Sequence, residues 1–413
     1  MIECRYLHPA IKLPGWVYIY FVPKPLTGLR ICYEAQLNPA LAGFSKDFRQ
    51  QPWDFIPGQR NANGDFSQRR FSSMPLHQKL PPILFIGCLS MLFAEVCSGA
   101  SQTWFITGWG LLLTFPLYLG HVLLFLNLAF RTKRTSLIHL YLFGMIFGLY
   151  ESWITKVLWA GYIDASGPVK TFLGVGVSEF PVLVFFWHPI MSFIIPILVY
   201  EILTGKAIAD HELLLKKTAR KTAMITMSLI VISTFIANGN KFNLISANSS
   251  FIGTILIISG LFYLSRKADL HSLRLAKKGF FLLSLYLVFL YLITFFWLLP
   301  KRIPTTILPF ATIIAFYFIA IGLLMSSNQV IYDLKEVDSS SYSVRRLIKF
   351  AIISLVVINI ACLVPQISFI ILTITSFLLI FLGLSLFFVI SYKILKRCWK
   401  KSSVTDCIYL SDK

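Results

Sequence analysis

Acidic residues are scarce in this chain, because 18 Asp and Glu stand against 38 Lys and Arg in 413 residues. Charged residues of both signs make up only 14% of the sequence. A soluble chain of this length needs far more polar surface to cover a core. Hydrophobic residues contribute 56%, and the mean hydropathy is +0.73. This composition excludes an ordinary soluble protein and indicates an integral membrane protein.

Cysteine is also sparse, with seven residues and no C-x-x-C pair. The spacing therefore supports neither a disulfide framework nor a cysteine metal site. Cys88, Cys97 and Cys362 fall in apolar runs, where cysteine packs as a small hydrophobe. The sequence holds no H-E-x-x-H, no G-x-S-x-G and no paired Asp motif. We therefore predict neither a metal site nor a cofactor.

Long apolar runs are what the chain has instead. Runs of ~20 residues are long enough to cross a hydrocarbon core of ~30 Å as helices. The sequence predicts an all-α, polytopic membrane bundle with about ten spans, at Leu80–Gly99, Trp109–Phe130, Ser136–Trp159, Phe180–Leu203, Ala223–Asn238, Ser249–Ser265, Gly279–Leu299, Thr305–Met325, Leu347–Leu363 and Ile367–Ile390. The fifth and sixth are short. They are either re-entrant segments or two helices joined by a polar outer loop, and we favour the helices.

Positive charge alternates with these runs. Of the 38 Lys and Arg, 33 fall in segments on one side, and four fall on the other, at Lys170, Lys241, Lys301 and Arg302. The positive-inside rule then predicts that both termini are cytoplasmic, in a protein of the cell (plasma) membrane. The basic segments lie in short loops and tails, so the expected partners are the bilayer and its anionic lipid headgroups, and not nucleic acid.

Four regions follow from this pattern. Residues 1–73 predict an N-terminal extension that is poorly ordered or cytoplasmic. Residues 74–204 hold the first four spans, which carry the intramembrane ionisable residues, and residues 205–395 hold six further, mostly apolar spans. Residues 396–413 form a basic tail. The first span is either an uncleaved anchor, which we favour, or a secretory signal peptide.

Ionisable side chains inside a membrane are costly and mark functional sites. Glu95, Glu151 and His188 all fall in the outer half of the membrane. At ~1.5 Å per residue, the two glutamates lie ~22 Å from the cytoplasmic edge and His188 lies ~12 Å from the outer edge. The wider set of candidates for a polar site adds Thr155, Lys156, Glu179 and His121. Thr155 shares a helix face with Glu151, being four residues away.

Gly144 and Gly148 form a small-x-x-x-small pattern that permits close helix packing. Glu151 therefore has two interpretations, a carboxylate beside a packing seam or one that binds a cation or relays a proton. We predict a transporter or permease of a small solute or ion, with its polar site in the outer half of the first four spans. Two alternatives stay open: a membrane-embedded enzyme acting on a lipid or membrane substrate, and a non-catalytic assembly subunit.

Overall fold

The computed structural model describes residues 11–12, 18–19, 76–162, 167–168, 170–266, 268–330 and 333–411. The chain divides into two compact units, Met1–Asn61 and Ala62–Lys413. In the first unit the described residues form one antiparallel pair, β1 (Ile11–Lys12) with β2 (Tyr18–Ile19). The predicted extension at 1–73 lies outside the described residues apart from these two strands.

The second unit confirms the predicted helical membrane bundle. Among the described residues, nine helices are long and apolar enough to cross a membrane: Lys79–Val96, Gly110–Thr132, Glu179–Thr204, Ala219–Gly239, Leu244–Leu264, Lys277–Trp297, Leu308–Ser326, Val344–Leu363 and Pro365–Trp399. The later helices expose large apolar side chains on their outer faces, among them Phe281 and Phe289. Such faces suit contact with lipid rather than water.

The elements of the second unit follow one another in a simple order. The first part comprises α2 (Leu76–Met91), η2 (Leu92–Val96), η3 (Gly110–Thr114), α3 (Phe115–Thr132), α4 (Leu137–Gly148), α5 (Tyr150–Trp153), α6 (Val157–Ala160), β3 (Thr171–Phe172), β4 (Val175–Gly176), α7 (Glu179–Val182), η4 (Leu183–Ile194) and α8 (Ile195–Thr204). The second part comprises β5 (Lys206–Ile208), η5 (Ala209–His211), α9 (Glu212–Leu215), α10 (Ala219–Gly239), α11 (Leu244–Leu264), η6 (Leu270–Leu273), α12 (Lys277–Trp297), η7 (Pro300–Arg302), α13 (Leu308–Ser326), β6 (Leu334–Glu336), α14 (Val344–Leu363) and α15 (Pro365–Ser411).

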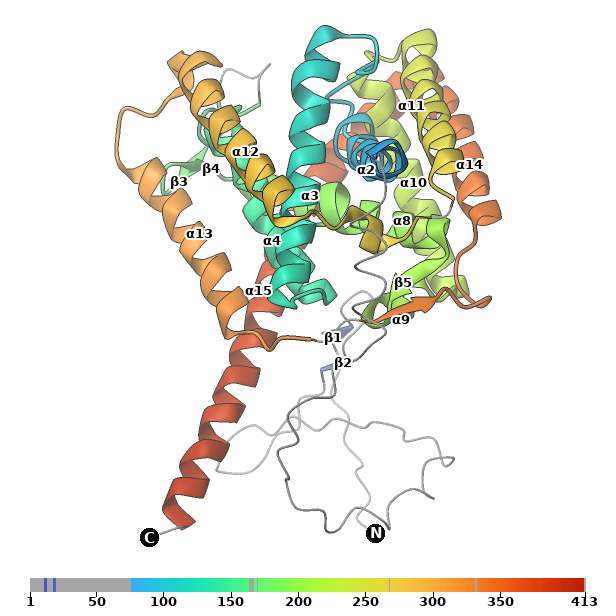
Figure 1. Cartoon of the computed structure of the whole chain (residues 1–413). Helices are drawn as coiled ribbons and strands as arrows, with labels where there is room; N and C mark the ends of the chain where they lie inside the picture. The colour runs from blue at the N-terminus through green and yellow to red at the C-terminus, as the bar shows by residue number, and fades with distance from the viewer. Residues whose placement is uncertain are drawn as a thin grey trace, which may run out of the picture. The chain divides into compact units, whose positions relative to one another are not determined.

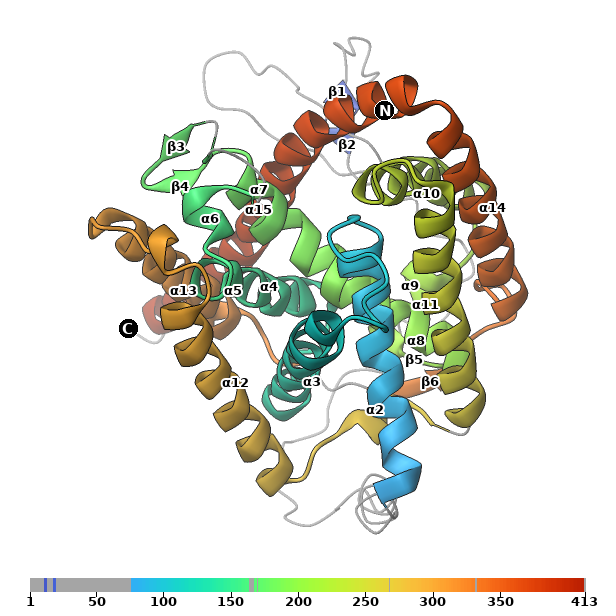
Figure 2. The same cartoon turned by 90° about the horizontal axis from the view of Figure 1, so that it is seen from above.

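The buried core is formed by the earliest helices. Figures 1 and 2 show α2, α3, α4 and α8 between two outer groups, α12 with α13 on one side and α10, α11 and α14 on the other. Most of the fully buried large side chains belong to this central set, including Phe85, Leu126, Tyr141 and Tyr200. α4 packs extensively against η4, the helix that carries His188, and the candidate site lies beside this contact.

The third predicted span is the one that departs from a continuous helix. Instead of running from Ser136 to Trp159, the helix α4 ends at Gly148, and the short helices α5 and α6 follow. Lys156 between them adopts a left-handed conformation with φ of 58°. Ser152 and Thr155 donate hydroxyl hydrogen bonds to backbone carbonyls at Leu149 and Glu151. Such bonds compete with regular helix pairing, so part of the cause of the break is local.

The two short spans become full helices. α10 and α11 are 21 residues each, and the link between them shrinks to a few residues because α11 begins at Leu244. The side chain of Asn243 accepts a hydrogen bond from the Ser246 backbone amide at 2.9 Å, which caps the helix start. The favoured prediction of two helices therefore describes this region. α15 also continues well past the predicted end at Ile390, to Ser411.

The predicted loops gather into two sets, as alternating sidedness requires. In the basic set, β5 pairs with β6 in an antiparallel ladder of three residue pairs. The backbone carbonyl of Lys133 accepts a hydrogen bond from the Val330 amide at 2.8 Å. In the other set, the Gln102 side-chain amide donates a hydrogen bond to Gly239 O at 2.7 Å, and the Arg302 guanidinium donates one to Gly161 O at 3.0 Å. We call these the basic end and the outer end. That the basic end is cytoplasmic stays a prediction.

Candidate functional site

Three ionisable residues of the core lie where helices depart from regular α geometry. Glu95 is in η2 and His188 is in η4, both of which are π-helical, while Glu151 follows the break after α4. Pro189 lies inside η4, where its missing amide frees a backbone carbonyl. π-Helical turns and interrupted helices are frequent at functional sites, because they reposition side chains and free backbone groups.

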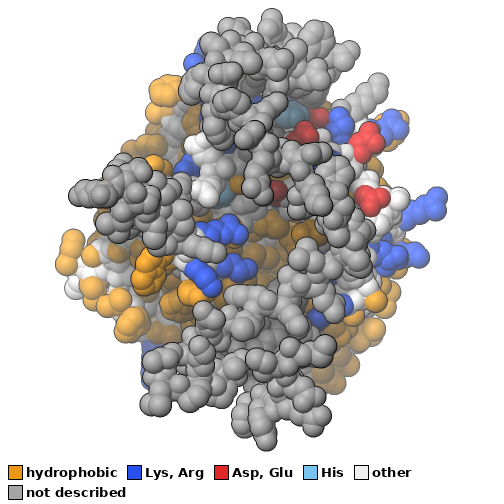
Figure 3. All heavy atoms as spheres, turned by 90° about the horizontal axis from the view of Figure 1, so that it is seen from below, with side chains coloured by type: hydrophobic (Ala, Val, Ile, Leu, Met, Phe, Trp, Pro, Cys, Tyr) orange, Lys and Arg blue, Asp and Glu red, His pale blue; other side chains and the backbone are white. Residues whose placement is uncertain are grey.

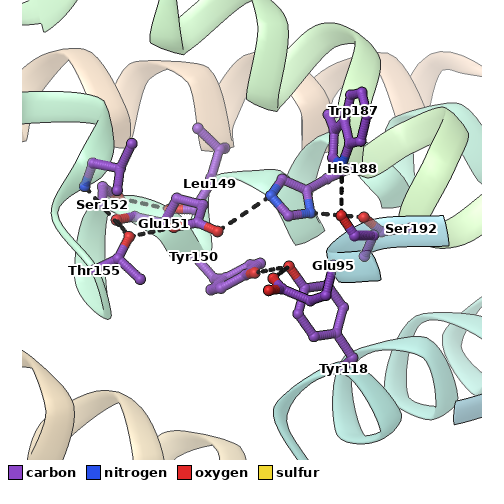
Figure 4. A network of polar contacts seen from close by, with 12 residues as sticks. Glu95, Tyr118, Leu149, Tyr150, Glu151, Ser152, Thr155, Trp187, His188 and Ser192 are labelled. Atoms are coloured by element: carbon purple, nitrogen blue, oxygen red, sulfur yellow. Dashed lines mark hydrogen bonds and ion pairs between the residues drawn. The ribbon is translucent and has the colours of Figure 1, made fainter. Parts of the chain in front are cut away.

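Glu151 and His188 meet directly. His188 Nε2 lies 3.3 Å from Glu151 Oε1, and both residues are buried, with 1% and 8% of their surface exposed. This contact has the distance of an ion pair but not the angle of a hydrogen bond. The opposite carboxylate oxygen accepts from the Thr155 hydroxyl. Figure 4 shows His188 between Glu151 and Ser192, whose Oγ lies 3.0 Å from Nδ1.

A second series of hydrogen bonds runs from Glu95 to Tyr150, the residue next to Glu151. Glu95 accepts from Tyr118 Oη and from Ser101 Oγ, each at 2.6 Å. The Tyr150 hydroxyl donates to Tyr118 Oη at 2.9 Å. Tyr150 is the neighbour of Glu151 in the chain, and its ring packs edge-on against His188, as Figure 4 shows. We call the eight residues Ser90, Glu95, Ser101, Tyr118, Tyr150, Glu151, His188 and Ser192 the polar column.

The polar column runs from the outer end to the middle of the membrane. Ser101 lies in the outer loop, whereas Ser192 falls halfway along the 26-residue span Glu179–Thr204. Ser90 Oγ donates to Ser192 O at 2.7 Å, which ties α2 to η4 at the inner limit of the column. Next to it the core is apolar, with Phe85, Ile86 and Leu140 fully buried, and the buried polar residues Asn127, Glu201 and His211 lie further toward the basic end. The column therefore ends blind at mid-depth.

The glycines of α4 set the spacing that brings Glu151 to His188. A Cβ at Gly144 would lie 2.4 Å from Pro189 Cα, and one at Gly148 would lie 3.2 Å from His188 Cβ. α4 and η4 thus touch through backbone. This close approach places the first turn after α4 beside the imidazole.

Four of the predicted residues lie outside the polar column: Thr155, whose hydroxyl donates to Glu151, and Lys156, Glu179 and His121. Lys156 is fully buried, but its Nζ donates to the carbonyls of Thr294 (2.8 Å) and Leu298 at the end of α12. It acts as a helix cap. Glu179 accepts from Ser178 Oγ at 2.7 Å at the start of α7. His121 lies at the edge of the polar column. Its ring packs on Tyr150, but its Nε2 lies 2.6 Å from Tyr291 Oη, outside the column.

Sequence reasoning did not single out the hydroxyl groups of the column. Tyr118 and Tyr150 lie in apolar runs rich in aromatic residues, where a tyrosine reads as packing. The available signal was position: Tyr150 directly precedes Glu151, and Tyr118 lies three residues before His121. Among the described residues, no group of three His, Cys, Asp or Glu side chains could hold a metal ion.

A second buried pair at the basic end also escaped sequence reasoning. His211 Nδ1 lies 2.9 Å from Glu201 Oε1, both side chains are fully buried, and Nε2 lies 3.1 Å from Thr135 O. Glu201 also accepts from the Ile208 amide at 3.0 Å, which anchors the last residue of β5. Burial lowers the pKa of His211, but the Glu201 carboxylate outweighs it, so the pKa is raised above its ordinary value. This pair is structural.

Comparisons with known proteins place the chain in a family. Residues 84–397 match the family described as "Uncharacterized membrane protein family". An uncharacterized protein of Archaeoglobus fulgidus is 34% identical over 225 residues, which cover 53% of this chain and 68% of that protein. No solved structure matches the chain. The matched residues include every residue of the polar column, and the chain therefore belongs to this uncharacterized membrane protein family.

Proposed function

We propose that the protein transports a small solute or ion and that its substrate or coupling proton binds at Glu151 and His188. The observation that supports this is a carboxylate–imidazole pair, buried in the core beside Tyr150, whose hydroxyl belongs to a series of hydrogen bonds that leads to the outer end. Transporters commonly bind near the bilayer midplane, where helices are interrupted. α5, η2 and η4 supply such interruptions.

The pair can exchange one charge for another. With a proton on His188, the imidazolium neutralises the Glu151 carboxylate across 3.3 Å. When that proton leaves, a buried carboxylate remains without a counter-charge, which is strongly unfavourable in a low dielectric. A small cation or a returning proton then restores neutrality. This exchange couples the proton to the second species.

The tyrosines supply the route to the outer end. A hydroxyl can donate and accept at once, so the series Tyr150, Tyr118 and Glu95 can pass a proton by reorientation. Glu95 is half-buried and holds Ser101 in the outer loop, where water has access. Apolar side chains such as Phe85 and Ile86 fill the core next to Ser192, so release to the other side needs a conformational change of the bundle.

Proton flux into proteoliposomes tests the proposal. The full-length protein is reconstituted with a pH-sensitive dye inside, an outward K⁺ gradient and valinomycin, and the dye reports proton uptake. Glu151→Gln is expected to reduce uptake to the level of empty liposomes. Tyr118→Phe keeps the ring but breaks the relay, and is expected to slow uptake about tenfold or more. The exposed carboxylate of Glu212 gives a matched control, Glu212→Gln, with wild-type uptake expected.

Two results would count against transport by this site. One is a folded, monodisperse Glu151→Gln protein with wild-type proton uptake. The other is wild-type protein that carries no proton current above empty liposomes under either polarity of the membrane potential.

One contact favours a second candidate, a membrane-embedded hydrolase or acyltransferase. Ser192, His188 and Glu151 lie in line, with the imidazole between a hydroxyl and a carboxylate. Nucleophilic catalysis uses this order, in which the base removes the hydroxyl proton and the carboxylate orients the base. A fluorophosphonate probe would label Ser192 in that case. Labelling should vanish in Ser192→Ala and persist in Ser233→Ala, which alters another buried serine.

A further inference from the structure

An apolar cavity of about 360 Å³ opens between the core and the α12–α13 hairpin. It is lined by Phe125, Ile146, Trp153, Leu287, Tyr291 and Tyr317, among others, so helices α3, α4, α5, α12 and α13 all contribute. We call it the lateral cavity. Its volume lies at the lower end of the ~300–1,000 Å³ range of ligand sites.

The lateral cavity lies at the depth of lipid hydrocarbon. Leu287 and Val288, which line it, occupy the middle of the 21-residue helix α12. α12 exposes Leu285, Phe289 and Leu292 on its outer surface, as a lipid-facing helix does. A cavity at this depth with aromatic and aliphatic walls takes a hydrocarbon chain.

Cations stand at the basic end of the two helices that form its walls. α12 begins at Lys277 and Lys278, about seven residues or ~10 Å before the first lining residue, Ser284. α3 reaches Arg131 about seven residues after Leu124, and the Arg131 guanidinium binds Leu275 O at 2.9 Å. All three cationic side chains are exposed. Figure 3 shows Lys and Arg side chains on the face of the molecule seen from below and hydrophobic side chains at its rim.

The start of α12 adds to this positive field. Its N-cap, Ala276, makes no side-chain cap, so the first-turn amides are not covered by a capping side chain. Helix N-termini attract phosphate through these amides and the helix dipole. The distance of ~10 Å from the cations to the cavity matches the descent of an acyl chain from its phosphate into half a bilayer of ~15 Å.

We propose that the lateral cavity and the cations Arg131, Lys277 and Lys278 form a site for one anionic phospholipid of the leaflet at the basic end. The phosphate lies at the three cations, and one acyl chain enters the cavity and ends against Tyr291. The neighbouring hydrogen bond from Tyr291 to His121 closes the cavity toward the core. This site is separate from the polar column and independent of the transport proposal.

Photo-crosslinking tests the site in the full-length protein. The probes are phosphatidylglycerol and phosphatidylcholine with the same acyl chains, each carrying a diazirine in the middle of one chain. We expect phosphatidylglycerol to label the cavity walls at Leu287 and Ile146 at least fivefold more than phosphatidylcholine. Leu287→Trp, which fills the cavity, should abolish that label, whereas Phe289→Trp on the exposed face should leave it unchanged.

The charge requirement is tested separately. The pair Lys277→Gln and Lys278→Gln should bring the labelling ratio of the two lipids to about one, and Lys216→Gln with Lys217→Gln, also exposed at the basic end, should not. Equal labelling by the two lipids in the wild-type protein, or label spread over both faces of α12, would overturn the proposal. Size-exclusion profiles exclude unfolding. Proton uptake is not the readout, so failure here is distinct from failure of the transport proposal.

Discussion

Replacing Lys156 by Met separates a structural role from a role in transport. Lys156 is fully buried, and its Nζ donates to the carbonyls of Ile154 (3.3 Å), Thr294 (2.8 Å) and Leu298. Two of these carbonyls end α12, where a cation also meets the negative end of the helix dipole. Methionine fills the same volume but donates nothing. Lys156→Met should therefore loosen the attachment of α12 to the break after α4.

The magnitude follows from the carbonyls left without a donor. Each buried acceptor that loses its partner costs about 1–3 kcal/mol, and the dipole adds up to about 2 kcal/mol. Part of this loss is offset, because methionine needs no desolvation of an ammonium group. We expect a net destabilisation of about 2–4 kcal/mol, seen as a fall of several degrees in Tm.

The assay is the loss of monodisperse protein after heating in detergent, which gives an operational Tm. Lys241→Met is the matched control, because Lys241 is also left-handed, with φ of 54°, but is exposed in the outer loop. At a temperature where Lys156→Met is folded, proton uptake should equal that of the wild type. An unchanged Tm with abolished uptake would refute the capping role and would indicate that Lys156 takes part in the proposed transport site.

Two further predictions follow from close packing and from the pKa of His211. Gly144→Ala should destabilise the bundle by about 1–3 kcal/mol, because its Cβ would meet the Pro189 backbone, while Gly322→Ala, which meets nothing within 4 Å, should not. The raised pKa of His211 means that the pair with Glu201 stabilises the protein below about pH 6.5, the unfolded value, and that this contribution is lost as pH rises through the folded value. Wild-type Tm should therefore fall between pH 6 and pH 9, whereas His211→Gln should be less stable at pH 6 and show a flatter profile.

The spans and their two-sided arrangement could be predicted because their causes are local. An apolar run of ~20 residues can be recognised as a span from its own residues alone, and the cations between runs identify the loops that share one side of the membrane. The depth of Glu95, Glu151 and His188 could also be predicted by counting residues along each span. Their meeting could not, since it depends on the rotation of each helix about its axis. The structure supplies that rotation by packing Gly144 against Pro189.

The break in the third span had no local signature strong enough to predict it. Part of its cause lies far away, because Lys156 reaches Thr294, 138 residues further along the chain. The role of the Tyr118 and Tyr150 hydroxyls could not be predicted either, because it too depends on the packing of the helices. In a span with many aromatic rings, nothing in the sequence says which ring turns its hydroxyl toward a carboxylate.

The β5–β6 ladder has a mechanical consequence. It joins the segment after α8 to the segment before α14, and the Glu201–His211 pair locks the same corner to Thr135. Backbone ladders and buried ion pairs open rarely, so amide hydrogens of Ala207 and Lys335 should exchange with solvent slowly. The ladder therefore couples α8 to α14 at the basic end, and a movement of one of these two helices carries the other with it.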